Sequence, residues 1–405
     1  MTIETSNLLR TKAVSMHDIT KIKQNNPKDE ATVMPFSLPL VSVIIVNYNY
    51  GRFLKQAADT VFEQTYPNIE CIIVDNASTD CSAAVLLDIS AQYPGAKIVR
   101  RKDNGGQSLA SMEGFEASSG EYVVFLDADD YLLASFVETH VFVHLSLRVP
   151  VGFSSSDMIQ TVDSRIVLGT LAYLSEYVRS GRGISPGLLR RIDESAPGVW
   201  PLPGPGASIE TQVHLVEPGY AGDWMWAPTS GNCFRRDALQ LFLNNKDLPA
   251  LRSCTDSYLL RGINVVTGSV VIDRPLGIYQ LHGVNVFSKR PHLNGILSYD
   301  RDSHNELGRE LIIDHLIASP QLFLRKMPSP WHYMDALKAV DGAWPRLPSA
   351  VAGCRSYLAG RVVAEAATLA PALGFYHFIY WLKRLKVAPH VILKACLNRT
   401  TKKRS

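Results

Sequence analysis

Short apolar runs, each followed by a polar turn and an amphipathic stretch, recur along residues 41–153. The runs are rich in Val and Ile and are apolar at odd and even positions, which predicts strands buried on both faces of a sheet. They lie at Val41–Val46, Ile69–Val74, Ala96–Val99, Tyr122–Leu126 and Val149–Phe153. Helix-length segments separate them at 51–64, 80–93, 106–118 and 132–147. This alternation predicts an α/β fold with a mostly parallel sheet flanked by helices.

Beyond residue 153 the alternation weakens. Residues 184–206 contain five prolines and four glycines, which predicts irregular, exposed structure. Order is expected again near Trp224–Phe234, in a helix at 255–262 and in strands at 264–273 and 276–281. After residue 303 the pattern predicts helices to the end of the chain.

The composition excludes several classes of protein. With 46% hydrophobic and 20% charged residues among 405, the chain is neither disordered throughout nor collagen-like nor a coiled coil. A net charge of +3 does not indicate a nucleic-acid partner, and we expect none. The six cysteines form no Cys-x-x-Cys pair, and no apolar segment follows Met1, so we expect reduced thiols, no cleaved signal peptide and a cytoplasmic protein.

Polar side chains follow the predicted strands, at the edge of an α/β sheet where ligands bind. These turns span Asn47–Gly51, Asp75–Asp80, Lys102–Gly106 and Asp127–Asp130. The first turn has no Gly-x-Gly-x-x-Gly pattern, which argues against a dinucleotide site, and the chain has no Walker phosphate-binding loop.

Asp127 and Asp129 follow the fourth strand two residues apart. Carboxylates at this spacing suit a hard cation such as Mg²⁺ or Mn²⁺, which can join them to substrate phosphates. Asp300 and Asp302 have the same spacing, but no strand precedes them, so we do not assign them this role. The alternative for Asp127 is that it only caps the following helix.

Three of these segments, VSVIIVNYN (41–49), IVDNASTD (73–80) and GEYVVFLDADD (120–130), resemble the nucleotide-sugar-binding half of family 2 glycosyltransferases. The resemblance covers about residues 40–155 and continues more weakly through 230–236, 255–256 and 279–285. It implies the GT-A fold, a Rossmann-like sheet, and an inverting transferase that uses a nucleotide sugar.

The resemblance assigns the donor-binding residues. It places Val46 and Tyr48 at the nucleobase, and it makes Asp75 the acceptor of the uracil N3–H, which favours a UDP- or dTDP-sugar. It places Asp127 near the ribose, with the adjacent Ala128 also in the nucleotide-sugar site. A turn role for Asp75 and core packing for Tyr48 are the alternatives.

The resemblance also assigns the metal and the general base. It makes Asp129 a ligand of Mn²⁺ or Mg²⁺ with help from His282, and it makes Asp256 the base that deprotonates the acceptor hydroxyl. A structural His282 and a helix-capping Asp256 are the alternatives. Two departures from the family pattern are the absence of an Arg in Ala110–Gly114 and the presence of Thr255 where the family often has Glu.

From pattern and resemblance together we expect four segments. Residues 1–38 form a flexible N-terminal segment, 39–155 the nucleotide-sugar-binding half, 156–302 the acceptor-binding and catalytic half, and 303–405 a helical, basic C-terminal extension. Residues 366–382 have no charged side chain and precede a basic segment, so burial and peripheral contact with the inner face of an anionic membrane both remain open.

The predicted function is metal-dependent, inverting sugar transfer from a UDP- or dTDP-sugar to a glycan or lipid-linked acceptor, as in polysaccharide assembly. A non-catalytic module that binds a sugar nucleotide or glycan on the same fold is the first alternative. A nucleotidyltransferase is the second, but the turn at Asn47–Gly51 lacks the glycine-rich, basic loop such enzymes carry.

Overall fold

The structure is a computed structural model that describes residues 37–171, 173–183, 187–195, 199–220, 224–283, 285, 304–343 and 346–398. Leu38–Ser405 form one compact unit. Residues 1–36 of the predicted flexible segment lie outside the described residues.

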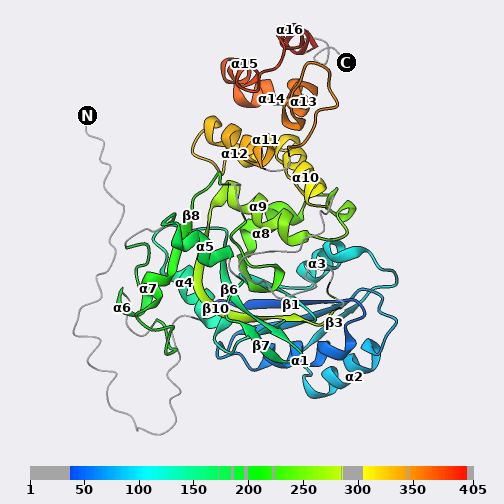
Figure 1. Cartoon of the computed structure of the whole chain (residues 1–405), viewed down its shortest axis with the longest axis vertical. Helices are drawn as coiled ribbons and strands as arrows, with labels where there is room; N and C mark the ends of the chain where they lie inside the picture. Colours follow the sequence, from blue (N-terminus) through cyan, green and yellow to red (C-terminus); the bar gives the residue numbers. More distant parts are fainter. Residues whose placement is uncertain are drawn as a thin grey trace, which may run out of the picture. The chain divides into compact units, whose positions relative to one another are not determined.

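The first four strands form a parallel sheet in the order β3-β2-β1-β4 (Figure 1). They are β1 (Val41–Asn47), β2 (Ile69–Asp75), β3 (Lys97–Arg100) and β4 (Tyr122–Asp127), joined by α1 (Gly51–Phe62), α2 (Ser82–Gln92) and α3 (Gly106–Glu116). Successive strand side chains alternate between two cores: Ile44 and Ile72 join that of α3, whereas Val43 and Ile73 join that of α1 and α2. The strands are apolar at odd and even positions because helices cover both faces of the sheet, as predicted.

The second half of the sheet contains both parallel and antiparallel pairs and continues the order as β4-β9-β6-β10-β5. Strand β9 lies antiparallel between β4 and β6, whereas β6 and β10 pair in parallel. The added strands are β5 (Tyr131–Leu132), β6 (Phe153–Val162), β7 (Arg165–Leu168), β8 (Val213–Val216), β9 (Asn232–Arg235) and β10 (Ser269–Leu281). The predicted α/β sheet flanked by helices is confirmed, with these antiparallel pairs added.

Several boundaries differ from the expected ones. The fifth predicted strand starts only at Phe153 and runs on to Val162. The two strands expected at 264–273 and 276–281 are the single strand β10, whose pairing with β6 shifts in register around Pro275. Proline lacks the N–H that a ladder needs, so the sequence around it looks like a break although the strand continues. Residues 264–267, which were expected to begin the first of these strands, belong to helix α9 (Thr255–Thr267).

Short helices connect these strands. They are α4 (Phe136–Ser146), α5 (Tyr173–Arg179), α6 (Ile192–Ser195), α7 (Ile209–Gln212) and α8 (Arg236–Leu243), with 3₁₀ turns η2 (Thr229–Gly231) and η3 (Leu248–Ala250). Apart from α6, the described parts of 184–206 are irregular, as predicted from their prolines and glycines.

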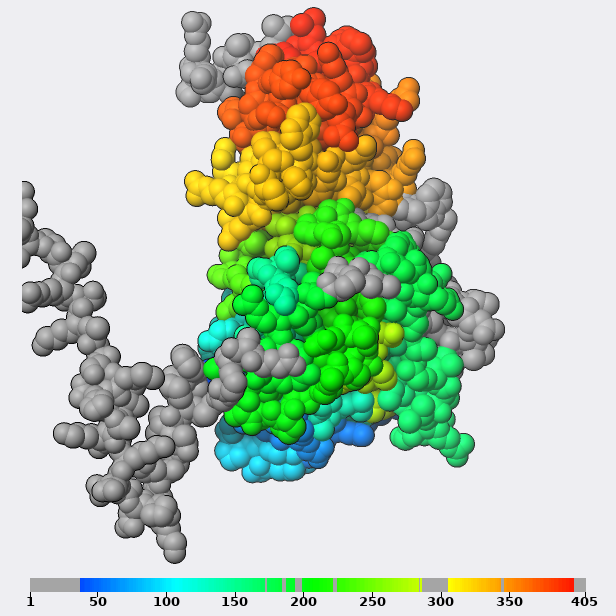
Figure 2. Space-filling view, turned by 90° about the vertical axis from the view of Figure 1, so that its left-hand side faces the viewer, coloured from blue at the N-terminus to red at the C-terminus, as the bar shows by residue number. Residues whose placement is uncertain are grey.

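The C-terminal region is helical, as predicted, and packs on α8 and α9 through one shared hydrophobic core. In the space-filling view its yellow helices lie directly on the green part of the chain (Figure 2). The helices are α10 (His304–Ala318), α11 (Pro320–Leu324), α12 (Pro330–Gly342), α13 (Tyr357–Ala364), α14 (Ala366–Leu373), α15 (Phe375–Arg384) and α16 (Pro389–Asn398). None of the described helices has the length and apolar character needed to cross a membrane.

Candidate active site

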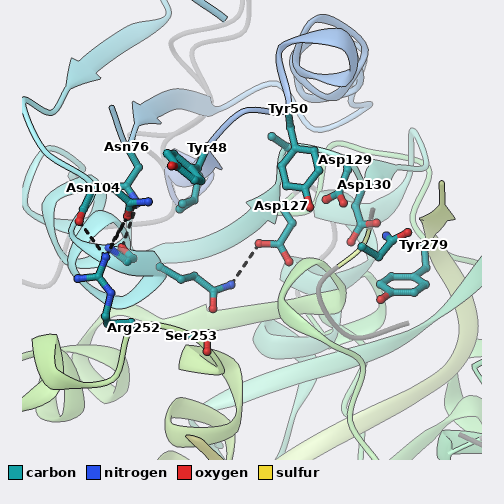
Figure 3. Close-up of a pocket in the computed structure, with 15 residues that line it drawn as sticks. Tyr48, Tyr50, Asn76, Asn104, Asp127, Asp129, Asp130, Arg252, Ser253 and Tyr279 are labelled. Atoms are coloured by element: carbon teal, nitrogen blue, oxygen red, sulfur yellow. Dashed lines mark hydrogen bonds between the residues drawn. The ribbon is translucent and has the colours of Figure 1, made fainter. Parts of the chain in front are cut away.

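A cavity of about 350 Å³ opens at the carboxyl ends of β1, β2 and β4. In Figure 3, Asn76, Asn104 and Arg252 lie on one side of it and Asp129, Asp130 and Tyr279 on the other, with Asp127 between them. The lining residues are Val46, Tyr48, Tyr50, Asn76, Asn104, Gly106, Gln107, Asp127, Ala128, Asp129, Asp130, Arg252, Ser253, Tyr279 and Asn285. Of the predicted site residues, Val46, Tyr48, Asp127, Ala128 and Asp129 therefore lie together on its wall.

Three carboxylates, those of Asp127, Asp129 and Asp130, line the middle and one side of the cavity. Burial, with the charges of Asp129 and Asp256, raises the pKa of Asp127 to about 7. Burial, with the charges of Asp129 and Asp127, raises the pKa of Asp130 well above its usual value. Asp130 is held by the Ser230 hydroxyl, which donates over 2.7 Å, and by the Gln280 N–H over 3.2 Å. Buried negative charge of this density would be stabilised by a cation.

His282 contacts Asp129 directly. Its Nε2 lies 2.9 Å from Oδ2 of Asp129, and its ring stacks on Phe53 with 4.5 Å between ring centroids. Nδ1 of His282 is buried and has no hydrogen-bond partner among the described residues. Carboxylate and imidazole are suitable ligands for Mn²⁺, so this pair fits the predicted metal.

Across the described ranges, no three His, Cys, Asp or Glu side chains are grouped as a ready-made metal site. Mg²⁺ and related ions often take only one or two protein carboxylates and complete their shell with phosphate and water oxygens. A cation at Asp129 would therefore depend on ligands from a bound substrate.

The other end of the cavity has amide and aromatic groups and one arginine. Tyr48 is 42% exposed on the cavity wall and can offer its ring to a planar ligand. Asp75 is buried and accepts from Nδ2 of Asn47 over 3.0 Å, and it is not among the residues that line the cavity. Its neighbour Asn76 lines the cavity instead, so the assignment of Asp75 to the uracil N3–H stays a prediction.

Asn76, Asn104 and Arg252 form a small hydrogen-bonded group at this end. Nδ2 of Asn76 donates to Oδ1 of Asn104 over 3.0 Å, and Nη2 of Arg252 donates to the Asn104 carbonyl over 2.9 Å. The two asparagines follow β2 and β3, where the sequence placed polar turns, whereas no sequence signal marked Arg252. Arg252 brings a cation to the cavity although the family's usual Arg is absent from Ala110–Gly114.

Gln107 joins the donor side of the cavity to helix α9. Its Nε2 lies 3.3 Å from Oδ1 of Asp127 and 3.4 Å from the Thr229 hydroxyl, and its Oε1 accepts from the Thr255 N–H over 3.3 Å. The hydroxyls of Ser108 and Thr255 lie 2.7 Å apart. Thr255, where the family often has Glu, thus ties the first turns of α3 and α9 together.

Asp256 lies in the first turn of α9, half-buried, and burial raises its pKa. Its Oδ1 accepts from the Ser257 N–H over 2.8 Å, and its charge is one of those that raise the pKa of Asp127. A carboxylate of raised pKa beside a cavity of this kind can act as a proton acceptor. Asp256 is not among the lining residues, so its role as the base stays a prediction.

Comparison with known proteins gives consistent matches. Residues 42–148 match the family model described as Glycosyl transferase family 2. An uncharacterized glycosyltransferase of Nostoc sp. is 31% identical over 245 residues, which are 60% of this chain and 66% of that protein. The glycosyltransferase GlyG of Streptococcus pneumoniae is 33% identical over 100 residues, 25% of this chain and 33% of that protein.

Two solved structures are also similar. TarS 1–349 of S. aureus in complex with UDP has a TM-score of 0.46 and 14% identity, covering 89% of this chain and 88% of that one. The mannosyltransferase PcManGT of Pyrobaculum calidifontis, in complex with GDP-Man and Mn²⁺, has a TM-score of 0.39 and 16% identity, covering 96% and 94%.

Proposed function

Because this chain belongs to glycosyl transferase family 2, we propose that it transfers a sugar from a UDP- or dTDP-sugar to an acceptor hydroxyl with inversion at the anomeric carbon. The observation that carries the proposal is the cavity wall. Tyr48 lies on the side of Asn76, Asp129 lies on the opposite side, and Asp127 lies between them, an order that supports our assignment of these residues to the base, the diphosphate and the ribose.

Donor binding follows from this order. Tyr48 stacks on the nucleobase, Asp127 accepts from a ribose hydroxyl, and Val46 and Ala128 pack against the nucleoside. Asp129, with His282, would hold Mn²⁺ or Mg²⁺ at the diphosphate. When bound, the cation neutralises the negative charge that develops on the departing nucleoside diphosphate.

Asp256 supplies the general base. The acceptor oxygen attacks the anomeric carbon while the bond from that carbon to the diphosphate oxygen breaks, and the hydroxyl proton passes to the Asp256 carboxylate. The raised pKa of Asp256 strengthens it as a base, because burial disfavours its charged form. One displacement inverts the configuration and needs no covalent intermediate on the protein.

The acceptor we propose is a glycan or a lipid-linked sugar, as polysaccharide assembly requires. The support comes from the C-terminal helices, where Tyr376 and Tyr380 are exposed and the exposed Lys383 follows them. We place the enzyme in the cytoplasm.

The test is nucleoside-diphosphate release from UDP-, dTDP- and GDP-sugars with Mn²⁺, Mg²⁺ or EDTA. We expect metal-dependent release of UDP or dTDP, loss of the metal response in Asp129→Ala, and release lowered about 10²- to 10⁴-fold in Asp256→Asn with nucleotide affinity retained. Asp237→Asn is the matched control, because Asp237 also lies in the first turn of a helix but is exposed.

Two outcomes would contradict the proposal. Absence of nucleotide binding would remove the donor site altogether. Metal-dependent binding without release, unchanged when acceptor glycans are added, would instead favour the non-catalytic sugar-nucleotide-binding module.

A further inference from the structure

Helix α15 has one buried and one exposed aromatic face. Phe378, Trp381 and Leu382 are buried in the core of the C-terminal helices. Tyr376 and Tyr380, one helical turn apart, are 74% and 44% exposed. The uncharged stretch 366–382 is therefore divided: part of it is buried in the protein, and part faces outward.

The exposed tyrosines belong to a contiguous aromatic patch, which consists of Trp331, Tyr376, His377 and Tyr380. The Trp331 ring lies 4.8 Å from that of His377 and 5.2 Å from that of Tyr380, and the Tyr376 and His377 rings lie 5.8 Å apart. Trp331 comes from α12, so two helices build the patch. Tyrosine, tryptophan and histidine combine an apolar body with a polar tip, which suits a boundary between water and an apolar phase.

Exposed basic side chains follow the aromatic patch along the chain. Lys383 lies on the same stripe of α15, at i+7 from Tyr376 and i+3 from Tyr380, and Lys386 and Lys394 are also exposed. Residues 319–405 contain fourteen of the 41 Lys and Arg in the chain but three of its 38 Asp and Glu. The positive charge of the chain is thus concentrated at its C-terminal end.

The three acidic residues of this region do not offset that charge at the surface. Asp335 pairs with Arg384 over 3.2 Å and Asp341 is buried, while Glu365 lies 3.8 Å from Arg361, which also pairs with Asp314 over 2.7 Å. Among the described residues of 319–398, exposed basic side chains therefore outnumber exposed carboxylates.

We propose that the aromatic patch and the basic residues that follow it bind the surface of an anionic lipid bilayer. Trp and Tyr favour the level of the lipid headgroups, and Lys and Arg near the bilayer are attracted to its anionic surface. A ten-residue helix is about 15 Å long, too short to span the hydrocarbon core, so α15 lies in the plane of the interface. This inference does not depend on the transferase activity.

A protein partner fits the surface less well. Lysine is depleted in protein–protein interfaces, whereas here Lys383 follows the aromatic rings, and the region carries a large net positive charge. A second copy of the chain would bring the same positive charge against itself.

The experiment is vesicle flotation of the full chain, with vesicles of phosphatidylcholine alone or of phosphatidylcholine mixed with phosphatidylglycerol, at low and high salt. We expect flotation only with the anionic vesicles and its loss at high salt. The double variants Tyr376→Ser/Tyr380→Ser and Lys383→Glu/Lys386→Glu should each weaken binding about tenfold or more. The double variant Leu87→Ser/Ile166→Ser, at exposed apolar positions outside the C-terminal helices, is the matched control.

The proposal fails if the chain floats equally with neutral vesicles, does not float with anionic ones, or floats unchanged in both test variants. It also fails if the variants change the molecular mass by light scattering but not flotation, which would indicate a protein interface. Donor hydrolysis in solution should be the same in all of these proteins. Absence of flotation by the wild-type chain therefore contradicts this proposal, whereas absence of donor hydrolysis by the wild-type chain contradicts the proposed function.

Discussion

Nε2 of His282 lies 2.9 Å from Oδ2 of Asp129, although 153 residues separate the two in the sequence. The contact follows from the sheet: β10 runs antiparallel to β5, with Ile278 opposite Tyr131, so the end of β10 returns to the turn that follows β4. The contact brings together the two side chains predicted to hold the metal, and their role in metal binding stays a prediction.

Replacement of His282 should weaken metal binding without abolishing nucleoside binding. We expect His282→Ala to raise the Mn²⁺ concentration for half-maximal nucleotide binding about 10- to 100-fold, as loss of a metal-supporting group does. A Mn²⁺ titration followed by nucleotide fluorescence measures this. His332→Ala, at an exposed histidine of α12, is the control. An unchanged Mn²⁺ titration in His282→Ala would show that His282 does not support metal binding.

Tyr48 should contribute to nucleotide affinity through its ring. Loss of one base–aromatic stack costs about 1–3 kcal/mol, so Tyr48→Ala should weaken UDP binding about 5- to 150-fold. Tyr48→Phe keeps the ring and should bind nearly as well as the wild type. Calorimetry of UDP binding distinguishes the two, and equal losses in both variants would assign the contribution to the hydroxyl instead.

Gln107→Glu should create a pH-dependent defect. The new carboxylate would lie beside Asp127, whose pKa is already raised to about 7 by burial and by Asp129 and Asp256. Added repulsion is greatest when both groups are charged, so the loss of nucleotide affinity should be large at alkaline pH and shrink as pH falls below 7. Nucleotide binding measured across this pH range tests the prediction, with Gln92→Glu at an exposed glutamine as the control. A loss of affinity that does not depend on pH would show that repulsion between the two carboxylates is not its cause.

Two buried histidines should make the fold sensitive to acid. Burial lowers the pKa of His144 to about 4, and burial with the nearby His144 lowers that of His140. Both rings are neutral in the folded chain but gain protons near pH 6.5 when unfolded, so stability falls as pH drops through this range. His144 alone should account for about 2 kcal/mol between pH 7 and pH 5.

Urea unfolding at the two pH values measures this loss. His144→Gln should reduce the pH dependence, whereas His332→Gln, at an exposed histidine, should leave it unchanged. An equal pH dependence in wild type and His144→Gln would show that other groups cause it.

Gly106→Ala should destabilise the start of α3. Gly106 has a φ of +84°, and a Cβ there would lie 2.7 Å from the Arg252 carbonyl oxygen. Left-handed backbone for alanine costs about 1–3 kcal/mol, and the clash would also push apart the segments before α3 and α9. Thermal unfolding should show the loss in Gly106→Ala but not in Gly95→Ala, where no atom lies within 4 Å of the added Cβ.

The order of elements from Val41 to Asp127 could be predicted from the sequence because it is a local property. Each buried strand is apolar at odd and even positions, and polar residues follow each strand in the next turn. Tyr48, Asp127 and Asp129 could therefore be assigned to one edge of the sheet without knowledge of any contact. Prediction of local structure was weaker beyond residue 149. There, β6 starts at Phe153 and β10 continues past Pro275, because pairing partners supplied by distant strands decide where these strands begin and end.

Only the tertiary structure decided the contacts between distant segments. The family resemblance had already assigned His282 and Asp129 to one metal site, but their direct contact depends on strand register. The link from Gln107 to Thr255 and the presence of Arg252 at the cavity depend on helix packing, which no local pattern encodes. The same holds for α15, where the sequence supplied aromatic and basic residues and left two interpretations open. Packing divides these residues between the core and the surface, because Trp381 is buried while Tyr376 on the same helix faces outward.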